Sequence, residues 1–328
     1  MLDLLTGLKE GQEIINQRRA AQEAEKVGQF RGGNSGFVVN GEIRGKCPRA
    51  TLLRFLGVNE QHNFSKQLMF RAGELAEQIT LPMVQASWSG KILTQQEAAT
   101  KWILERQGKD GIAVTGSPDI VLADETGKPE YGIECKNIMS YWTMDSVGPW
   151  GKFKQGKPEP KPDHVVQAAH YAWQLNVPYF IVYTNTVNWQ VMTKGMTGLA
   201  GYDEYVTRNG SRVYRVEPFV MIFAVTINDK GQVRVTNTLT GQVMSTDITV
   251  QGIKDYYKII IDSLDREELP PRMVNRDLSG TMLEWSMYDP KYNPLSELHD
   301  MYDAQRLSFH DFVEQARIIY SQPTSTGE

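Results

Sequence analysis

The chain has 328 residues, enough to bury a substantial core in one large domain or in one domain with additions. Its composition, 41% hydrophobic and 23% charged, is that of a globular protein, and its net charge of −4 argues against a uniformly basic nucleic-acid coat. No apolar run approaches the length of a membrane span, no signal peptide is recognisable, and two cysteines exclude a four-cysteine metal site within the chain. We therefore expect a cytoplasmic protein without a membrane partner.

The first third of the chain favours helices. Residues 8–27 predict a charged amphipathic helix, and "RGGNSG" (31–36) predicts a flexible break. The stretch "CPRATLLRFLG" (47–57) predicts a helix that Pro48 opens and the final glycine closes. A further helix is expected over residues 65–79.

The middle of the chain changes to strand patterns. Residues 101–116 are rich in β-formers, and "GSPDIVLADETGKPEYGIECKN" (116–137) predicts two strands joined by a turn. Residues 137–163 are rich in Pro, Gly and polar side chains, which predicts a long loop. A helix over 164–176 and a strand over 179–185 follow.

The last part of the chain predicts a strand pair, "PFVMIFAVTIND" and "QVRVTNTLTG", and then a helix with an apolar stripe between residues 253 and 264. Together the elements indicate an α/β fold. The expected division is an N-terminal helix and flexible segment (1–44), a core (45–200), a β/α elaboration packed on that core (201–320) and a frayed tail (321–328).

Three charged residues in the predicted hairpin are candidates for catalysis. Side chains two apart in a strand share a face, so Glu134 and Lys136 point the same way, and Asp119 can meet them across the hairpin. Two carboxylates suit Mg²⁺ or Mn²⁺, with the backbone carbonyl of Cys135 as a third oxygen ligand. Lys136 would orient or deprotonate a water, or neutralise charge at phosphorus. The alternative is a surface hairpin that merely carries charges.

Positive charge for a DNA backbone is concentrated in the predicted loop and on the 47–57 helix. Aromatic side chains interleaved with the loop lysines can stack on bases, although a solvated loop explains the same pattern. His164 can contact a phosphate or be an ordinary surface histidine, and His170 is expected to be a packing or surface residue. The candidate DNA contacts are Arg49, Arg54, Trp150, Lys152, Phe153, Lys154, Lys157, Lys161 and His164.

Four motifs in order give a resemblance to a known family. The motifs are G-x-x-x-E ending at Glu77, P-D at Asp119, E-x-K over 134–136, and Q-x-x-x-Y from Gln167 to Tyr171. Together they resemble the PD-(D/E)xK nuclease superfamily, and more narrowly its RecB-like branch of bacteriophage exonucleases and CRISPR-associated nucleases. The resemblance covers roughly residues 45–190 and implies a mixed central sheet flanked by the Glu77 and Gln167/Tyr171 helices.

The resemblance also implies residue roles. Asp119 and Glu134 would bind the metal, Lys136 would be the catalytic lysine, and Gln167 with Tyr171 would support the lysine and the DNA backbone. Glu77 stands where many relatives have a metal-binding histidine, and we favour it over Glu74. The stretch 267–290 resembles the relatives' cysteine-bearing segment but contains no cysteine. No iron–sulfur cluster is therefore expected, and Cys47 is expected to be a buried thiol.

The implied function is metal-dependent hydrolysis of DNA, most closely that of a phage-type exonuclease acting at duplex ends or on single strands in replication, recombination or DNA degradation. Oligomerisation, a phage recombination or replication partner and a location in the host cytoplasm are compatible with this function. A structure-specific endonuclease, an RNA-directed nuclease and a non-catalytic DNA-binding protein that retains the nuclease fold stay open as alternatives.

Overall fold

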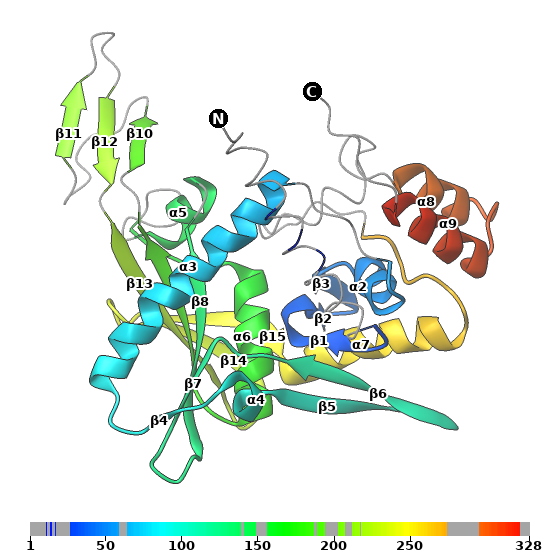
Figure 1. Ribbon diagram of the computed structural model, residues 1–328, viewed down its shortest axis with the longest axis horizontal. Coiled ribbons are helices and arrows are strands. Elements are labelled where there is room, and N and C mark those ends of the chain that lie inside the picture. Colours follow the sequence, from blue (N-terminus) through cyan, green and yellow to red (C-terminus); the bar gives the residue numbers. More distant parts are fainter. Residues whose placement is uncertain are drawn as a thin grey trace.

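The computed structural model describes residues 27–58, 64–138, 141–148, 156–186, 189–193, 203–206, 212–216, 218–273 and 295–321, with Gly11, Ile14 and Gln17. The chain has a mixed α/β fold around a seven-stranded mixed sheet, as expected (Figure 1). In spatial order β15 (Val243–Thr249), β14 (Gln232–Asn237), β13 (Phe219–Ile227), β9 (Tyr179–Asn185), β8 (Pro129–Asn137), β7 (Ile120–Ala123) and β4 (Lys91–Ile92) form this sheet. Within this sheet β8 and β9 pair in parallel, and the other strand pairs that the structure describes are antiparallel. The expected helix over 8–27 lies outside the described residues, apart from three helical positions and Val27.

Alternation along β9 shows why helices cover both faces of the sheet. Tyr179, Ile181 and Tyr183 pack into the main core with α6 (Pro162–Leu175), whereas Phe180 and Val182 pack into a second cluster against α3 (Phe64–Ser87). The two helices therefore lie on opposite faces. The strand and the α6 helix both fall close to the ranges predicted from the sequence.

The C-terminal strands belong to the central sheet itself. β13 pairs with β9 along its length, and β14 and β15 extend the sheet beyond it. The expected boundary at residue 200, with a C-terminal part packed on a completed core, therefore does not follow the sheet. A smaller antiparallel sheet precedes β13 and consists of β10 (Trp189–Thr193), β12 (Arg212–Val216) and β11 (Asp203–Val206).

Residues 31–36 form ordered structure, unlike the flexible break expected there. The segment runs from β1 (Phe30–Arg31) through a 3₁₀ turn, η1 (Gly32–Asn34), into β2 (Gly36–Val39) and β3 (Glu42–Gly45). A Cβ at Gly32 would stand 2.6 Å from His170 Cδ2, so the turn presses directly on α6. Gly and Ser in this segment reflect close packing, which composition alone does not distinguish from flexibility.

A third sheet joins the segment that begins at Phe30 to a β-hairpin formed by residues 100–116. β1 pairs in parallel with β6 (Lys109–Gly116), which pairs with β5 (Thr100–Arg106). α7 (Val250–Asp265) carries the predicted apolar stripe, and its buried side chains include Ile253, Tyr256 and Ile260. The remaining helices are α2 (Pro48–Phe55), α4 (Gln95–Ala98), α5 (Tyr141–Val147), α8 (Ser296–Asp303) and α9 (Phe309–Ser321).

Two predictions for these segments differ from the structure: the end of one helix, and a loop that contains another helix. α3 continues through Pro82 to Ser87, past the end expected at residue 79, because Leu81 and Val84 pack on the second apolar cluster. That burial offsets the backbone hydrogen bond lost at the proline. α5 interrupts the segment 137–163 that was expected to be a loop, and its Met144 and Val147 are fully buried.

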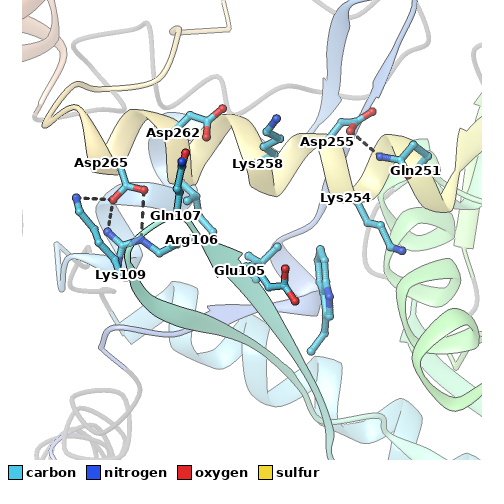
Figure 2. Close-up of a pocket in the computed structure, with 13 residues that line it drawn as sticks. Glu105, Arg106, Gln107, Lys109, Gln251, Lys254, Asp255, Lys258, Asp262 and Asp265 are labelled. Carbon is cyan, nitrogen blue, oxygen red and sulfur yellow. Dashed lines mark hydrogen bonds and ion pairs between the residues drawn. The ribbon is translucent and has the colours of Figure 1, made fainter.

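A cleft of about 610 Å³ lies between the tip of the β5–β6 hairpin and α7, with Trp102, Lys254, Lys258 and Asp255 among its lining residues (Figure 2). At one end Asp265 binds Arg106 and, at 2.8 Å, Lys109. These two cations hold the pKa of Asp265 near 2. Acidic and basic residues both line the cleft, and none of the four sequence motifs contributes a residue to it.

In the described part of the chain no helix has the length and apolarity to cross a membrane.

Candidate active site

The β7–β8 hairpin brings Asp119 beside the E-x-K strand, as the sequence predicted. Ile120 pairs with Ile133, which sets the register of the hairpin. Asp119 then stands opposite the next residues of β8, and its Oδ2 accepts a hydrogen bond of 2.7 Å from the backbone N–H of Cys135. The bond uses one of the two carboxylate oxygens and fixes the direction of the side chain.

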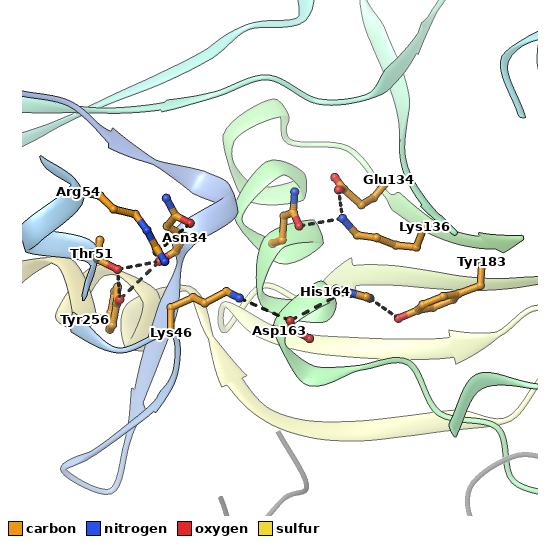
Figure 3. A network of polar contacts seen from close by, with 11 residues as sticks. Asn34, Lys46, Thr51, Arg54, Glu134, Lys136, Asp163, His164, Tyr183 and Tyr256 are labelled. Atoms are coloured by element: carbon orange, nitrogen blue, oxygen red, sulfur yellow. Dashed lines mark hydrogen bonds and ion pairs between the residues drawn. The ribbon is translucent and has the colours of Figure 1, made fainter. Parts of the chain in front are cut away.

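Glu134 and Lys136 share one face of β8 and contact each other directly (Figure 3). Lys136 Nζ donates to Glu134 Oε1 at 2.5 Å and to Gln167 Oε1 at 3.2 Å. Glu134 is 2% exposed, and its second oxygen, Oε2, is buried without a hydrogen-bond partner. A buried carboxylate oxygen without a partner is costly, so this atom points to a ligand that would complete it.

The carboxylates repel one another in this site. Burial raises the pKa of Glu134 to about 7, with Asp119 adding to the rise and Lys136 opposing it. Burial also raises the pKa of Asp119, against the effects of Lys136 and the Cys135 N–H. For Lys136, burial lowers the pKa, but Glu134 and Asp119 outweigh it and the net shift is upward. Lys136 is therefore a cation at neutral pH, which suits orientation and charge stabilisation better than proton abstraction.

The Q-x-x-x-Y pair lies behind the lysine. Gln167 accepts from Lys136, and a hydrogen bond joins Gln167 to the buried Tyr171. Tyr171 packs against Tyr179 with ring centroids 5.7 Å apart. His170, one residue earlier, is fully buried and packs edge-on against the ring of Tyr171, with centroids 5.8 Å apart, so of the two expectations for it, packing or surface, the structure supports packing. α6 thus supports Lys136 from the face of the sheet opposite to the one that α3 covers.

Glu77 is the carboxylate of α3 whose pKa responds to the charges of the site. Burial raises the pKa of Glu77, and the charges of Asp119 and Glu74 raise it further. Glu77 in turn raises the pKa of Glu134. Glu74 instead forms an ion pair of 3.3 Å with Arg71 on the same helix. The electrostatics therefore favour Glu77 over Glu74 as the helical member of the acidic group.

The acidic residues of the site suit a divalent cation in part. Within the described ranges, no three His, Cys, Asp or Glu side chains already converge closely enough to hold a metal ion. Asp119 and Glu134 nevertheless fit one, because Glu134 Oε2 is buried and unpartnered and the charge of Asp119 helps to raise the pKa of Glu134. A hard cation such as Mg²⁺ or Mn²⁺ prefers such oxygens. The thiol of Cys135 is buried with a pKa of about 12 and does not suit a ligand role.

The expected DNA contacts have different outcomes. Trp150, Lys152, Phe153 and Lys154 lie outside the described residues. Lys157 is exposed, Lys161 caps the start of α6, and Arg54 is exposed on α2, with Nη1 3.5 Å from Asn34 Oδ1. These three stay candidates for phosphate contacts.

Arg49 and His164 differ from the expected DNA contacts. Arg49 is 3% exposed, and its guanidinium binds Pro270 O at 2.9 Å and Asp303 Oδ1 at 2.7 Å, so it stabilises the fold and has no free face for a phosphate. His164 Nδ1 lies 2.7 Å from the hydroxyl of Tyr183. Burial lowers the pKa of His164 to about 3, so this side chain is neutral and not a cation for DNA.

Lys46 and Asp163 lie beside the site and belong to none of the four motifs. Lys46 Nζ is 3.8 Å from Asp163 Oδ2, and the charge of Asp163 helps to raise the pKa of Lys136 (Figure 3). The only sequence signal for this pair is an acid in the first turn of a predicted helix, which commonly serves the helix dipole. The pairing becomes visible only in three dimensions. Cys47, next along the chain, is buried as expected.

No known protein-family model matches the chain, and no curated protein or solved structure is significantly similar to it.

Proposed function

We propose that the chain is a metal-dependent deoxyribonuclease with a PD-(D/E)xK core, and that it acts as an exonuclease on DNA ends. The single observation that supports this most strongly is the buried, unpartnered Glu134 Oε2 beside Asp119 and Lys136. A purely structural hairpin does not require a buried acid pair with an incomplete hydrogen-bond set. The four motifs supply the resemblance from which exonuclease, as opposed to endonuclease, action is taken.

In the proposed reaction, Asp119 and Glu134 would hold Mg²⁺ or Mn²⁺, and Glu77 and the Cys135 carbonyl would be further oxygen donors. Such a cation, when bound, supplies an activated water and polarises the phosphodiester. Lys136 orients the water or donates to a non-bridging phosphate oxygen, because it carries a full positive charge. Gln167 and Tyr171 keep its ammonium in place. The chain's own contribution is thus to position charge around phosphorus.

The test is digestion of end-labelled linear duplex, single-stranded and closed-circular DNA with Mg²⁺ or Mn²⁺. Wild-type protein is compared with Lys136→Ala and with Lys230→Ala, an exposed lysine in the β13–β14 turn. We expect loss of linear DNA only, reduced about 10²–10⁴-fold in Lys136→Ala and unchanged in Lys230→Ala. The position of the label that is released first gives the polarity.

Other results would identify the alternatives. Cutting of closed circles would make the protein an endonuclease, and faster digestion of a matched RNA would make it an RNA-directed enzyme. DNA binding without any cutting, at any metal concentration, would support a non-catalytic protein that retains the fold.

A further inference from the structure

Lys46 occupies a defined position at the edge of the site. It follows β3 and lies between Gly45, in a left-handed conformation (φ 84°), and the buried Cys47, which is the N-cap of α2. A glycine permits that turn without strain, and burial fixes the next residue. The backbone of Lys46 is therefore held on both sides, while its side chain is 31% exposed. The ammonium group of Lys46 is therefore carried on a fixed backbone position.

The N–H donors of the Lys46 ammonium group stay available for a ligand. Its distance of 3.8 Å from Asp163 Oδ2 is within ion-pair range but too long for a hydrogen bond. An ammonium has three N–H donors, so Lys46 can bind a second anion while Asp163 neutralises part of its charge. Figure 3 shows Lys46 and Lys136 reaching toward α6 from opposite sides, with Asp163 near the first turn of the helix.

Asp163 is surrounded by cations. Burial raises the pKa of Asp163, but the neighbouring side chains, Lys46, Lys161 and Lys136 among them, outweigh burial and the net shift is downward. It is thus ionised and attracts Lys46 toward the same helix that supports Lys136 through Gln167. Lys136 is already occupied by Glu134 and Gln167, so a neighbouring phosphate needs another cation.

We propose that Lys46 binds a phosphate of the nucleic acid adjacent to the scissile one, and that Asp163 is its positioning residue. The inference rests on the proposed nuclease function. A phosphate at this point neutralises a lysine whose ion pair with the partly buried Asp163, at 3.8 Å, is too long for a hydrogen bond. The ligand is a phosphate group, either an internal phosphodiester or the terminal phosphate of a DNA end.

The test measures DNA binding with EDTA present, so that nothing is cleaved. Dissociation constants of a labelled linear duplex are measured between about 50 and 200 mM salt for wild type, Lys46→Ala, Lys46→Arg and Lys230→Ala. Loss of one phosphate contact reduces the slope of log K against log salt by about 0.9 and weakens binding about tenfold. Lys46→Arg and the Lys230→Ala control keep the wild-type slope.

Duplexes with 5′-phosphate, 3′-phosphate and hydroxyl ends distinguish the two sources of phosphate. An effect of Lys46→Ala that is equal on all ends assigns an internal phosphodiester, and an effect confined to one phosphorylated end assigns a terminal phosphate. In the double variant with Asp163→Asn, the loss equals that of Lys46→Ala alone, because the aspartate acts through the lysine.

The inference is overturned if Lys46→Ala keeps the wild-type slope and affinity while the wild type binds and cuts DNA. It is also overturned if Lys46→Ala lowers the unfolding midpoint of the protein and this loss of stability accounts for all of the weaker DNA binding. Lys46→Ala is expected to keep an unfolding midpoint close to that of the wild type, because the ion pair that it removes is partly exposed. A wild type that neither binds nor cuts DNA overturns the proposed function and this inference together.

Discussion

At the scale of single residues, Glu134 links the site to the stability of the fold. Burial raises its pKa from an ordinary value of 4.5 to about 7. Between these two values the folded state keeps a proton that the unfolded chain has already released. Stability from this group is therefore fully present below pH 4.5 and is lost as pH rises through 7. Asp119 and Glu77 shift in the same direction and add to the trend.

Glu134→Gln removes this loss of stability at high pH. We expect the variant to match the wild type near pH 5 and to be more stable than it at pH 8, by roughly 3 kcal/mol or less. Urea unfolding in EDTA measures both proteins at each pH. His164 and His170, whose pKa values are lowered, give the opposite trend below pH 6.5, but they cancel in the difference between the two proteins. A difference that does not change with pH would contradict the shift at Glu134.

The same pair of proteins reports on the metal. Mg²⁺ or Mn²⁺ that binds only the folded state raises the unfolding midpoint of the wild type in proportion to the logarithm of its concentration. Glu134→Gln keeps one oxygen but loses the charge, so the metal-dependent rise is expected to disappear. An equal rise in both proteins would place the cation elsewhere.

At the scale of elements, α6 and the strands beside the candidate site meet through close contacts that leave no room for a methyl group. A Cβ at Gly116, at the end of β6, would overlap the ring of Tyr171 and lie 2.5 Å from Thr100 Oγ1. Tyr171 is buried and bound to Gln167, so it cannot move without disturbing the support of Lys136. Gly116→Ala is therefore expected to destabilise the fold by about 1–3 kcal/mol and to lower nuclease activity.

Gly73 on α3 is the matched control. A Cβ there meets no atom within 4 Å among the residues described. Because glycine weakens a helix interior, Gly73→Ala is expected to stabilise the protein by about 0.5–1 kcal/mol. The urea unfolding midpoints of both variants test these two expected changes in stability. A Gly116→Ala protein as stable as the wild type would refute the close contact.

Most elements could be predicted because their residues carry local signals. The stripe of α7, the strand "YFIVYTN" and the β7–β8 hairpin each have the correct period, and the E-x-K spacing alone places Glu134 and Lys136 on one face. The errors occurred where tertiary packing overrides local signals. Pro82 sits within α3, α5 lies inside a Pro- and Gly-rich segment, and Gly32 packs under His170. Lys46 and Asp163 could not be paired, because only the fold brings them together.

At the scale of the whole molecule, Arg49 connects the α2 helix with the C-terminal helices. Its guanidinium donates to Pro270 O, contacts His299 Nδ1 at 3.3 Å and pairs with Asp303 of α8 at 2.7 Å. Phe312 of α9 packs on the ring of His299. One buried side chain thus joins segments that are far apart in the sequence.

Arg49→Met is expected to destabilise the protein by about 2–3 kcal/mol, since it removes several charge-assisted hydrogen bonds but leaves Asp303 partly solvated. Arg49→Lys should rescue little, because a single ammonium cannot reproduce the three contacts of the guanidinium. Hydrogen exchange should rise first in α8 and α9, while the salt dependence of DNA binding stays that of the wild type. A reduced salt slope with unchanged exchange in both helices would instead restore Arg49 as a DNA contact, and would mean that the C-terminal helices release it when DNA binds.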